Sequence, residues 1–276
     1  MPRKIITEEL KQEIINYYLS KPMTQAHLCE KYSLSSPTIG KILKGIERYS
    51  KAKLYNPNLK ERFFETINSE EAAYFLGLLI SDGNVFKDET GRQASISITL
   101  DLKDEYMLNK FKEVLNANTS VGYDGRGCGQ IAVRSNTMAQ DLAQYGVVPR
   151  KTNKTYLPII SPELMPHLIR GILDGDGSIQ AKQNGNKFLH DISFCGTARL
   201  MTEISEYITN ALNLQHQPAV YNYTDKMLSE IKIANINDME LLGNWLYKNA
   251  TIFLTRKKEK YISFIEHYNL DKIIPS

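Results

Sequence analysis

One eleven-residue pattern occurs twice in this chain, and the repeat constrains the fold more than any other feature. Residues 75–85 read FLGLLISDGNV, and residues 169–179 read IRGILDGDGSI. Both copies place a glycine within an apolar stretch, Gly77 and Gly171, and both end on Asp-Gly followed by an aliphatic residue. One buried helix ending in Asp-Gly is common, but two copies without a gap indicate an internal duplication.

The segments after the two copies also correspond, element by element. Each half continues with an alternating strand, an amphipathic helix, a hairpin and a second helix, predicted at 94–102, 104–115, 119–134 and 137–145 and at 188–195, 197–212, 219–234 and 236–247. A basic segment closes each half. Each half is therefore predicted to be αββαββα. We expect an α+β protein in which two pseudo-symmetric halves form a saddle of two antiparallel sheets.

The glycines and aspartates of the repeat explain how two halves could share one site. Gly77 and Gly171 lack side chains, so their helices can approach closely while the flanking apolar residues pack the halves together. Asp82 and Asp176 would then meet at the helix ends, where two like charges are tolerable only when cations share them. Oxygen ligands, completed by phosphate and water, favour Mg²⁺ over zinc.

Residues 75–83 and 169–177 resemble the two motif helices of the single-chain LAGLIDADG homing endonucleases, and the likeness extends over roughly residues 69–268. The resemblance implies a metal-dependent enzyme that hydrolyses phosphodiester bonds at a long, asymmetric site in double-stranded DNA. It implies Mg²⁺ as cofactor, with Mn²⁺ or Ca²⁺ able to occupy the same sites, and a monomer without an obligate protein partner. The implied metal ligands are Asp82, Asp176, Ser81 and Gly175.

The resemblance also implies a catalytic lysine after the final helix of each half. Lys151 and Lys257 would approach the active site and stabilise the charge that develops on the scissile phosphate. The alternative is that these lysines, with Arg150 and Arg256, are phosphate clamps or solvated charges.

Two neighbouring features depart from a symmetric site. Asp174 has Ile80 as its counterpart, so we expect a helix cap or a local hydrogen-bonding group there rather than a required ligand. A glutamine that often orients water in this family has no evident match near residues 100–102 or 194–196. The water-positioning residues are therefore unassigned.

The polar faces of the strands form the predicted DNA-reading surface, because a twisted sheet fits the major groove and its outward side chains reach base edges. The prediction applies to the group more than to any single member, since each is also typical of a solvated strand face. The candidates are Arg92, Ser95, Ser97, Thr99, Arg126, Gln130, Arg134, Lys182, Gln183, Lys187, Asp191, Ser193, Asn222, Tyr223 and Lys232.

The N-terminal segment is predicted to be helical. Residues 7–20 begin with a good N-cap and place apolar residues at helical spacing, and residues 24–43 contain two short helical patterns separated by a turn. This arrangement resembles a helix-turn-helix, which would turn Ser35, Ser36, Thr38, Lys41 and Lys44 toward the major groove. The alternative is a three-helix cap that touches no DNA.

The distribution of charge agrees with a DNA-binding segment at the N-terminus. The net charge is only +3, but residues 1–65 hold twelve Lys and Arg against seven Asp and Glu, and the remainder holds 22 against 24. The surplus that would attract phosphates lies at the N-terminus. We expect a helix-turn-helix domain at 1–48, a basic linker at 49–68, and the two halves at 69–157 and 158–276.

The remaining features are typical of a protein whose cysteines are reduced thiols. Three widely spaced cysteines support neither a disulfide framework nor a zinc site. The chain has no apolar run near the ~18 residues that cross a bilayer and no signal-peptide pattern, so we expect a cytoplasmic protein, or an organellar matrix protein if organelle-encoded, with no membrane partner.

The main rival function is a catalytically silent protein of the same fold, either a transcription regulator or an RNA maturase. The helix-turn-helix fits a regulator slightly better. The presence of both Asp82 and Asp176 favours cleavage, because a protein that only binds gains nothing from two carboxylates that face a polyanion.

Overall fold

The computed structural model describes residues 6–20, 25–44, 58–87, 93–123, 127–150, 154–223 and 228–270. The chain divides into two compact units, Met1–Asn58 and Leu59–Ser276, and each is described by itself. Within the described residues, no helix is long and apolar enough to span a membrane. The three cysteines are free thiols.

Among its described residues, the first unit has three short helices around a small apolar core. Ile14, Leu28 and Ile39 are fully buried in that core. Ser35 precedes the third helix in an extended conformation, and a proline occupies the first helical turn, as the sequence predicts. The helices are α1 (Glu8–Ser20), α2 (Gln25–Tyr32) and α3 (Ser36–Ile42).

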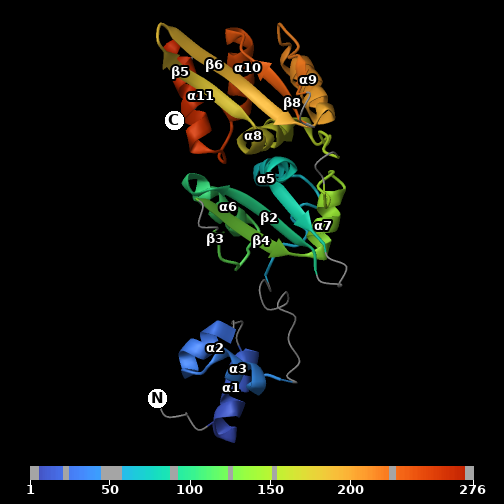
Figure 1. Cartoon of the computed structure of the whole chain (residues 1–276). Helices are drawn as coiled ribbons and strands as arrows, with labels where there is room; N and C mark the ends of the chain where they lie inside the picture. The colour runs from blue at the N-terminus through green and yellow to red at the C-terminus, as the bar shows by residue number, and fades with distance from the viewer. Residues whose placement is uncertain are drawn as a thin grey trace. The chain divides into compact units, whose positions relative to one another are not determined.

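The first half of the second unit has the predicted αββαββα order (Figure 1). Its four strands form one antiparallel sheet in the order β1-β2-β4-β3. The elements are α5 (Glu70–Ser81), β1 (Gly83–Phe86), β2 (Ser95–Asp101), α6 (Glu105–Val114), β3 (Gly122–Tyr123), β4 (Cys128–Arg134) and α7 (Asn136–Ala143).

The second half repeats this order, with its sheet arranged β5-β6-β8-β7. One helix is added at its end, where the sequence analysis expected only a basic segment. Tyr261, Phe264 and Ile265 are buried along one side of that helix and explain its formation. The elements are α8 (Met165–Asp176), β5 (Ser178–Asn184), β6 (Lys187–Gly196), α9 (Ala198–Leu212), β7 (Val220–Asn222), β8 (Ser229–Ile233), α10 (Ile236–Tyr247) and α11 (Thr255–His267).

The first half begins earlier than the sequence suggests. Phe64 is fully buried in the core, and Ile67 is 7% exposed. The hydroxyl of Ser135 donates to Glu61 over 2.9 Å, which ties the same segment to the sheet. We therefore place the start of this half at Leu59, within the stretch expected to be linker.

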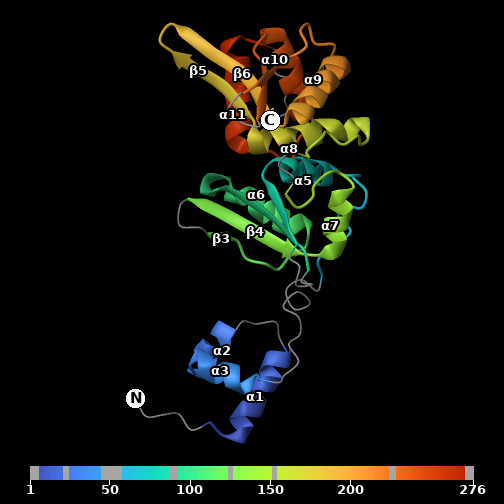
Figure 2. The same ribbon diagram turned by 45° about the vertical axis from the view of Figure 1, so that its right-hand side comes forward.

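Strand alternation separates a helix-packed face from an outward polar face in both sheets. In the first sheet, Ile98 pairs with Ile131 and both are fully buried, whereas the next pair, Thr99 and Gln130, is exposed. Helix α6 packs on the first sheet, and α9 and α11 pack on the second (Figures 1 and 2). Each sheet therefore has one face packed on helices and one face turned outward.

The two halves meet along α5 and α8, which lie side by side (Figures 1 and 2). A Cβ added at Gly77 would lie 2.1 Å from the backbone oxygen of Leu168, and one at Gly171 would lie 2.1 Å from that of Tyr74. Such contacts are impossible, so only glycine permits this crossing. The predicted close approach of the two motif helices is confirmed.

A buried ion pair spans the same seam. The Arg170 side chain on α8 is fully buried and donates to Glu70 on α5 over 2.6 Å. It also donates to the backbone oxygens of Leu246 (2.6 Å) and Ile252 (2.9 Å). The position equivalent to Arg170 in the first half is Leu76, so this cluster is built only once and makes the two halves different.

Candidate active site and DNA-facing surface

The two repeat aspartates lie at the same end of the seam. Asp82 caps α5, and Asp176 is the last residue of α8. A Cβ added at Gly175 would lie 3.3 Å from Oδ2 of Asp82, which places this carboxylate against the last turn of α8, one residue before Asp176. Asp82 is half-buried and Asp176 is exposed. The fold thus brings carboxylates from different halves together, facing solvent.

The residues before the aspartates form the tightest part of the seam. A Cβ at Gly175 would lie 1.9 Å from Oγ of Ser81, so no larger residue fits there. The Ser81 hydroxyl donates to the backbone oxygens of Gly77 (3.2 Å) and Leu78 (3.1 Å). The ligand roles expected of Ser81 and Gly175 stay predictions, and Gly175, which has no side chain, can offer only its backbone oxygen.

The donor set at this end fits a hard divalent cation. Both carboxylates stand at helix C-termini, where partial negative charge accumulates, so a cation is favoured. All donors are oxygens, which suits Mg²⁺ or Ca²⁺. Over the described parts of the chain, no group of three His, Cys, Asp or Glu could hold a metal by itself. Oxygens from a substrate and from water would complete the coordination.

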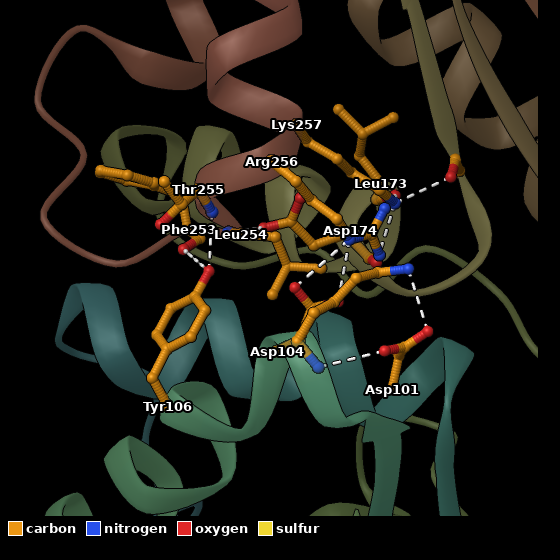
Figure 3. Close-up of polar contacts among 12 residues, drawn as sticks. Asp101, Asp104, Tyr106, Leu173, Asp174, Phe253, Leu254, Thr255, Arg256 and Lys257 are labelled. Carbon is orange, nitrogen blue, oxygen red and sulfur yellow. Dashed lines mark hydrogen bonds and ion pairs between the residues drawn. The ribbon is translucent and has the colours of Figure 1, made fainter. Parts of the chain in front are cut away.

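Asp174 serves as a buried hydrogen-bonding group, as the sequence analysis expected. Its Oδ2 accepts from the hydroxyl of Tyr74 across the seam over 2.9 Å. The same oxygen accepts from the backbone N–H of Leu254, just before α11, over 2.8 Å (Figure 3). Burial raises the pKa of Asp174, and nearby Lys257 opposes that rise. Asp174 therefore joins α5, α8 and α11.

Lys257 lies at the C-terminal end of α8, where its side chain is almost completely buried (Figure 3). Its Nζ donates to three backbone oxygens, those of Leu173 (2.5 Å), Asp174 (2.8 Å) and Gly177 (2.8 Å). Burial lowers the pKa of Lys257 to about 8, while the negative charges of Asp174 and Asp82 raise it. The ammonium thus complements the negative end of the helix that carries Asp176.

A second set of contacts fixes the start of α11 to the first half (Figure 3). Nε of Arg256 donates to Oδ2 of Asp104 over 2.9 Å. The Tyr106 hydroxyl donates to the backbone oxygen of Phe253 (3.2 Å) and accepts from the N–H of Thr255 (2.6 Å). Sequence reasoning missed Asp104 and Tyr106, because their only local signal is that of an ordinary helix start.

Most predicted DNA-reading residues share the outward faces of the two sheets. By register, these are Ser95, Ser97, Thr99, Gln130 and Arg134 on the first sheet and Lys182, Lys187, Asp191, Ser193 and Lys232 on the second. Ser97, Asp191 and Ser193 are buried among their neighbours, whereas the others are exposed or half-buried.

Two candidates point the other way. Gln183 pairs with Phe188, and Asn222 pairs with buried Ser229, so both belong to the helix-packed face. The amide of Gln183 donates to the backbone oxygen of Gly185 over 2.7 Å, and Asn222 accepts from Ser229 over 2.7 Å. The alternation of apolar and polar residues could not predict which face of the sheet these two side chains occupy, because that face depends on the strand register that the hairpins set. Arg92, Arg126 and Lys151 lie outside the described residues.

In the first unit, the predicted groove-facing residues lie in and around α3. Ser35, Ser36, Lys41 and Lys44 are exposed, and Thr38 is half-buried. The hydroxyls of Ser35 and Thr38 are 2.8 Å apart and hydrogen-bond to each other. Contact of these residues with DNA stays a prediction from the sequence.

Comparisons with known proteins identify the fold. No protein-family model matches the chain, and no curated protein matches it. Among solved structures, a double mutant of I-SmaMI is similar at a TM-score of 0.53 and 12% identity, covering 71% of this chain and 92% of that one. I-SmaMI bound to an uncleaved DNA target with calcium ions gives 0.50 and 13%, covering 74% and 93%. The LAGLIDADG meganuclease I-AabMI bound to uncleaved DNA gives 0.51 and 12%, covering 71% and 89%.

The second unit therefore has the fold of the LAGLIDADG homing endonucleases, as its two motif helices and its two sheets predict. At 12–13% identity, these comparisons establish the architecture.

Proposed function

We propose that this protein is a site-specific DNA endonuclease that hydrolyses phosphodiester bonds with divalent metal held by Asp82 and Asp176. One observation carries the proposal: the Gly77–Gly171 crossing brings a carboxylate from each half to one solvent-facing end of the seam. Solved structures of the same fold include a LAGLIDADG homing endonuclease bound to cleaved DNA and a LAGLIDADG meganuclease bound to uncleaved DNA.

Asp82 and Asp176 would hold the metal, with the backbone oxygens of Ser81 and Gly175 beside them. When bound, a divalent ion such as Mg²⁺ supplies Lewis-acid polarisation of the scissile phosphate and lowers the pKa of a bound water. The two carboxylates offer only hydrogen-bond acceptors. A phosphate can therefore approach this end of the seam only together with a cation. Calcium in one structure of the same fold supports a divalent ion.

Lys257 has two connected roles in this proposal. Its ammonium fixes the end of α8 through three backbone oxygens and so orients Asp176. It also places a positive charge near Asp82, where charge on the phosphate would develop. Lys151 is its proposed equivalent in the first half.

The outward faces of the two sheets would lie along the major groove and read base edges, with lysines such as Lys182, Lys187 and Lys232 meeting phosphates. The three-helix unit would add phosphate contacts through Lys41 and Lys44. Because one chain supplies both carboxylates and two different sheets, the protein would act as a monomer on an asymmetric site.

The test is cleavage of DNA selected from a random or genomic library. Asp82→Asn and Asp176→Asn should each abolish cutting in Mg²⁺ and leave binding in Ca²⁺ within a few-fold of the parent. Glu206→Gln on α9, an exposed acid on the helical side of the second sheet, is the matched control and should cut normally. Undiminished metal-dependent cutting by both aspartate variants would show that the site lies elsewhere.

The same experiment separates the rival function. A transcription regulator or maturase of this fold would bind nucleic acid specifically but leave DNA intact in Mg²⁺ and Mn²⁺. The N-terminal helices favour a regulator, and the two carboxylates at one end of the seam favour the nuclease.

A further inference from the structure

At one outward position, the two sheets of the second unit carry side chains of different chemistry. In the first sheet, the outward pair that follows the buried pair Ile98↔Ile131 is Thr99↔Gln130. In the second sheet, the corresponding outward pair, after Phe194↔Ile231, is Cys195↔Glu230. A neutral amide in one half is thus replaced by a carboxylate in the other.

The equivalence of these pairs follows from the start of each sheet. Ser97 pairs with the residue after Gly83, and Ser193 pairs with the residue after Gly177, so the two serines correspond. Two residues further along each strand, Thr99 and Cys195 correspond as well. Gln130 and Glu230 are therefore equivalent by register.

The hydrogen bonds of the two side chains are also different. The Gln130 amide donates to Oγ1 of Thr99 over 3.0 Å, and this side chain can both donate and accept. Oε2 of Glu230 accepts from the hydroxyl of Tyr223 over 2.5 Å. An ionised carboxylate only accepts, so the Glu230 side chain offers acceptors alone.

Nothing in the described part of the chain neutralises Glu230 through an ion pair. The nearby ammonium of Lys232 lies 3.7 Å from Asp191 instead. Tyr223 orients the Glu230 carboxylate without cancelling its charge. A carboxylate directed at DNA is repelled by phosphates, so it is favourable only where a base presents a donor.

We propose that Glu230, oriented by Tyr223, reads a cytosine in the half-site that faces the second sheet, and that Gln130 reads an adenine at the equivalent place in the other half-site. In the major groove, cytosine presents its N4 amino group as a donor, whereas guanine and thymine present acceptors that would repel a carboxylate. Adenine presents a donor beside an acceptor, which matches the two-sided amide of Gln130. This inference rests on the proposed function.

The experiment selects DNA by binding, so that it does not depend on cutting. The full chain, in Ca²⁺, is offered a randomised double-stranded library, and the bound sequences are compared between the parent, Glu230→Gln and the control Glu206→Gln. Glu230→Gln should lose a cytosine preference of about 10-fold or more at one position of one half-site and shift toward adenine. Glu206→Gln should leave every position unchanged.

Two further variants keep the test informative if Glu230→Gln folds poorly. Gln130→Glu should create a cytosine preference at one position of the opposite half-site. Tyr223→Phe should weaken the cytosine preference without changing the preferred base. Unaltered base preferences in Glu230→Gln and Gln130→Glu would overturn this inference and leave the proposed function intact. Selection of no sequence by the parent protein would overturn both.

Discussion

The backbone of Gly77 in α5 lies directly against the backbone of Gly171 in α8. A Cβ built on Gly77 would lie 3.0 Å from Cα of Gly171 and 2.1 Å from the backbone oxygen of Leu168. The separation of Asp82 from Asp176 depends on this contact, because each aspartate stands at the end of one of the two helices. The glycine pair therefore sets the geometry of the candidate active site.

Gly171→Ala should destabilise the second unit and abolish cutting. The added methyl group would meet Tyr74 and Leu78 backbone atoms at 2.1 and 2.9 Å, so the helices must separate. Overpacking of this kind costs about 1–3 kcal/mol or more. Urea unfolding measures the loss. Gly122→Ala is the control, since its nearest atom would lie 3.9 Å away, and equal stability of the two variants would contradict the prediction.

Arg170→Leu should lower the free energy of unfolding by about 3–5 kcal/mol, the usual cost of removing one partner of a buried ion pair. The substitution installs the residue found at Leu76, but it takes the guanidinium charge away from Glu70 and leaves the backbone oxygens of Leu246 and Ile252 without this donor. Glu70 keeps the neutral donors of Thr251 and the Ile252 backbone. Arg199→Leu provides the comparison, because its side chain is 66% exposed in an ion pair with Glu203 and should contribute at most about 1 kcal/mol. Similar losses of unfolding free energy in the two variants would show that the buried ion pair contributes no more than the exposed one.

Lys257 should titrate near pH 8, well below its unperturbed pKa of 10.5, because burial disfavours its charge. Between these two values the unfolded chain binds more protons than the folded chain. The free energy of unfolding should therefore rise with pH across this window, by about 3 kcal/mol in all from this residue. Below pH 8 both states are protonated, and the cost of burying the charge is fully present.

Two measurements check this behaviour. Side-chain NMR of labelled lysines should show one group that titrates near pH 8 and is missing in Lys257→Met. The stability of the parent relative to Lys257→Met should increase between pH 8 and 10. A flat difference would mean that Lys257 keeps an ordinary pKa.

Truncation should distinguish the two proposed boundaries. A chain that starts at Leu59 should fold as stably as the second unit of the full protein, whereas one that starts at Asn68 loses the buried side chains of Phe64 and Ile67. Loss of a buried phenylalanine side chain alone costs about 3–5 kcal/mol. Thermal unfolding of both chains measures the difference. Equal midpoints would show that residues 59–67 belong to the linker.

The chain from Leu59 should still cut DNA, but with weaker binding and a shallower dependence on salt. Removal of the three-helix unit takes away phosphate contacts and the counterions that they release. Unchanged affinity, footprint and salt dependence would show that this unit does not touch DNA.

The sequence by itself determined the architecture and the central pair of acids. The duplicated Gly-x₄-Asp-Gly pattern fixes two helices, one glycine contact and two helix-end carboxylates, since a helix places residues at set intervals along its axis. Alternation and helical spacing then predicted the order of elements in each half, except α11.

Tertiary structure decided what depends on contacts between distant segments. Lys257 lies 80 or more positions from the backbone oxygens that it bonds, and Asp174 lies 80 from Leu254. No local pattern signals such pairs, because each residue has the same neighbours in sequence whether or not the partner is present. The outward or inward direction of Gln183 and Asn222 likewise depended on strand register, which hairpin geometry sets and which reverses with a shift of one residue.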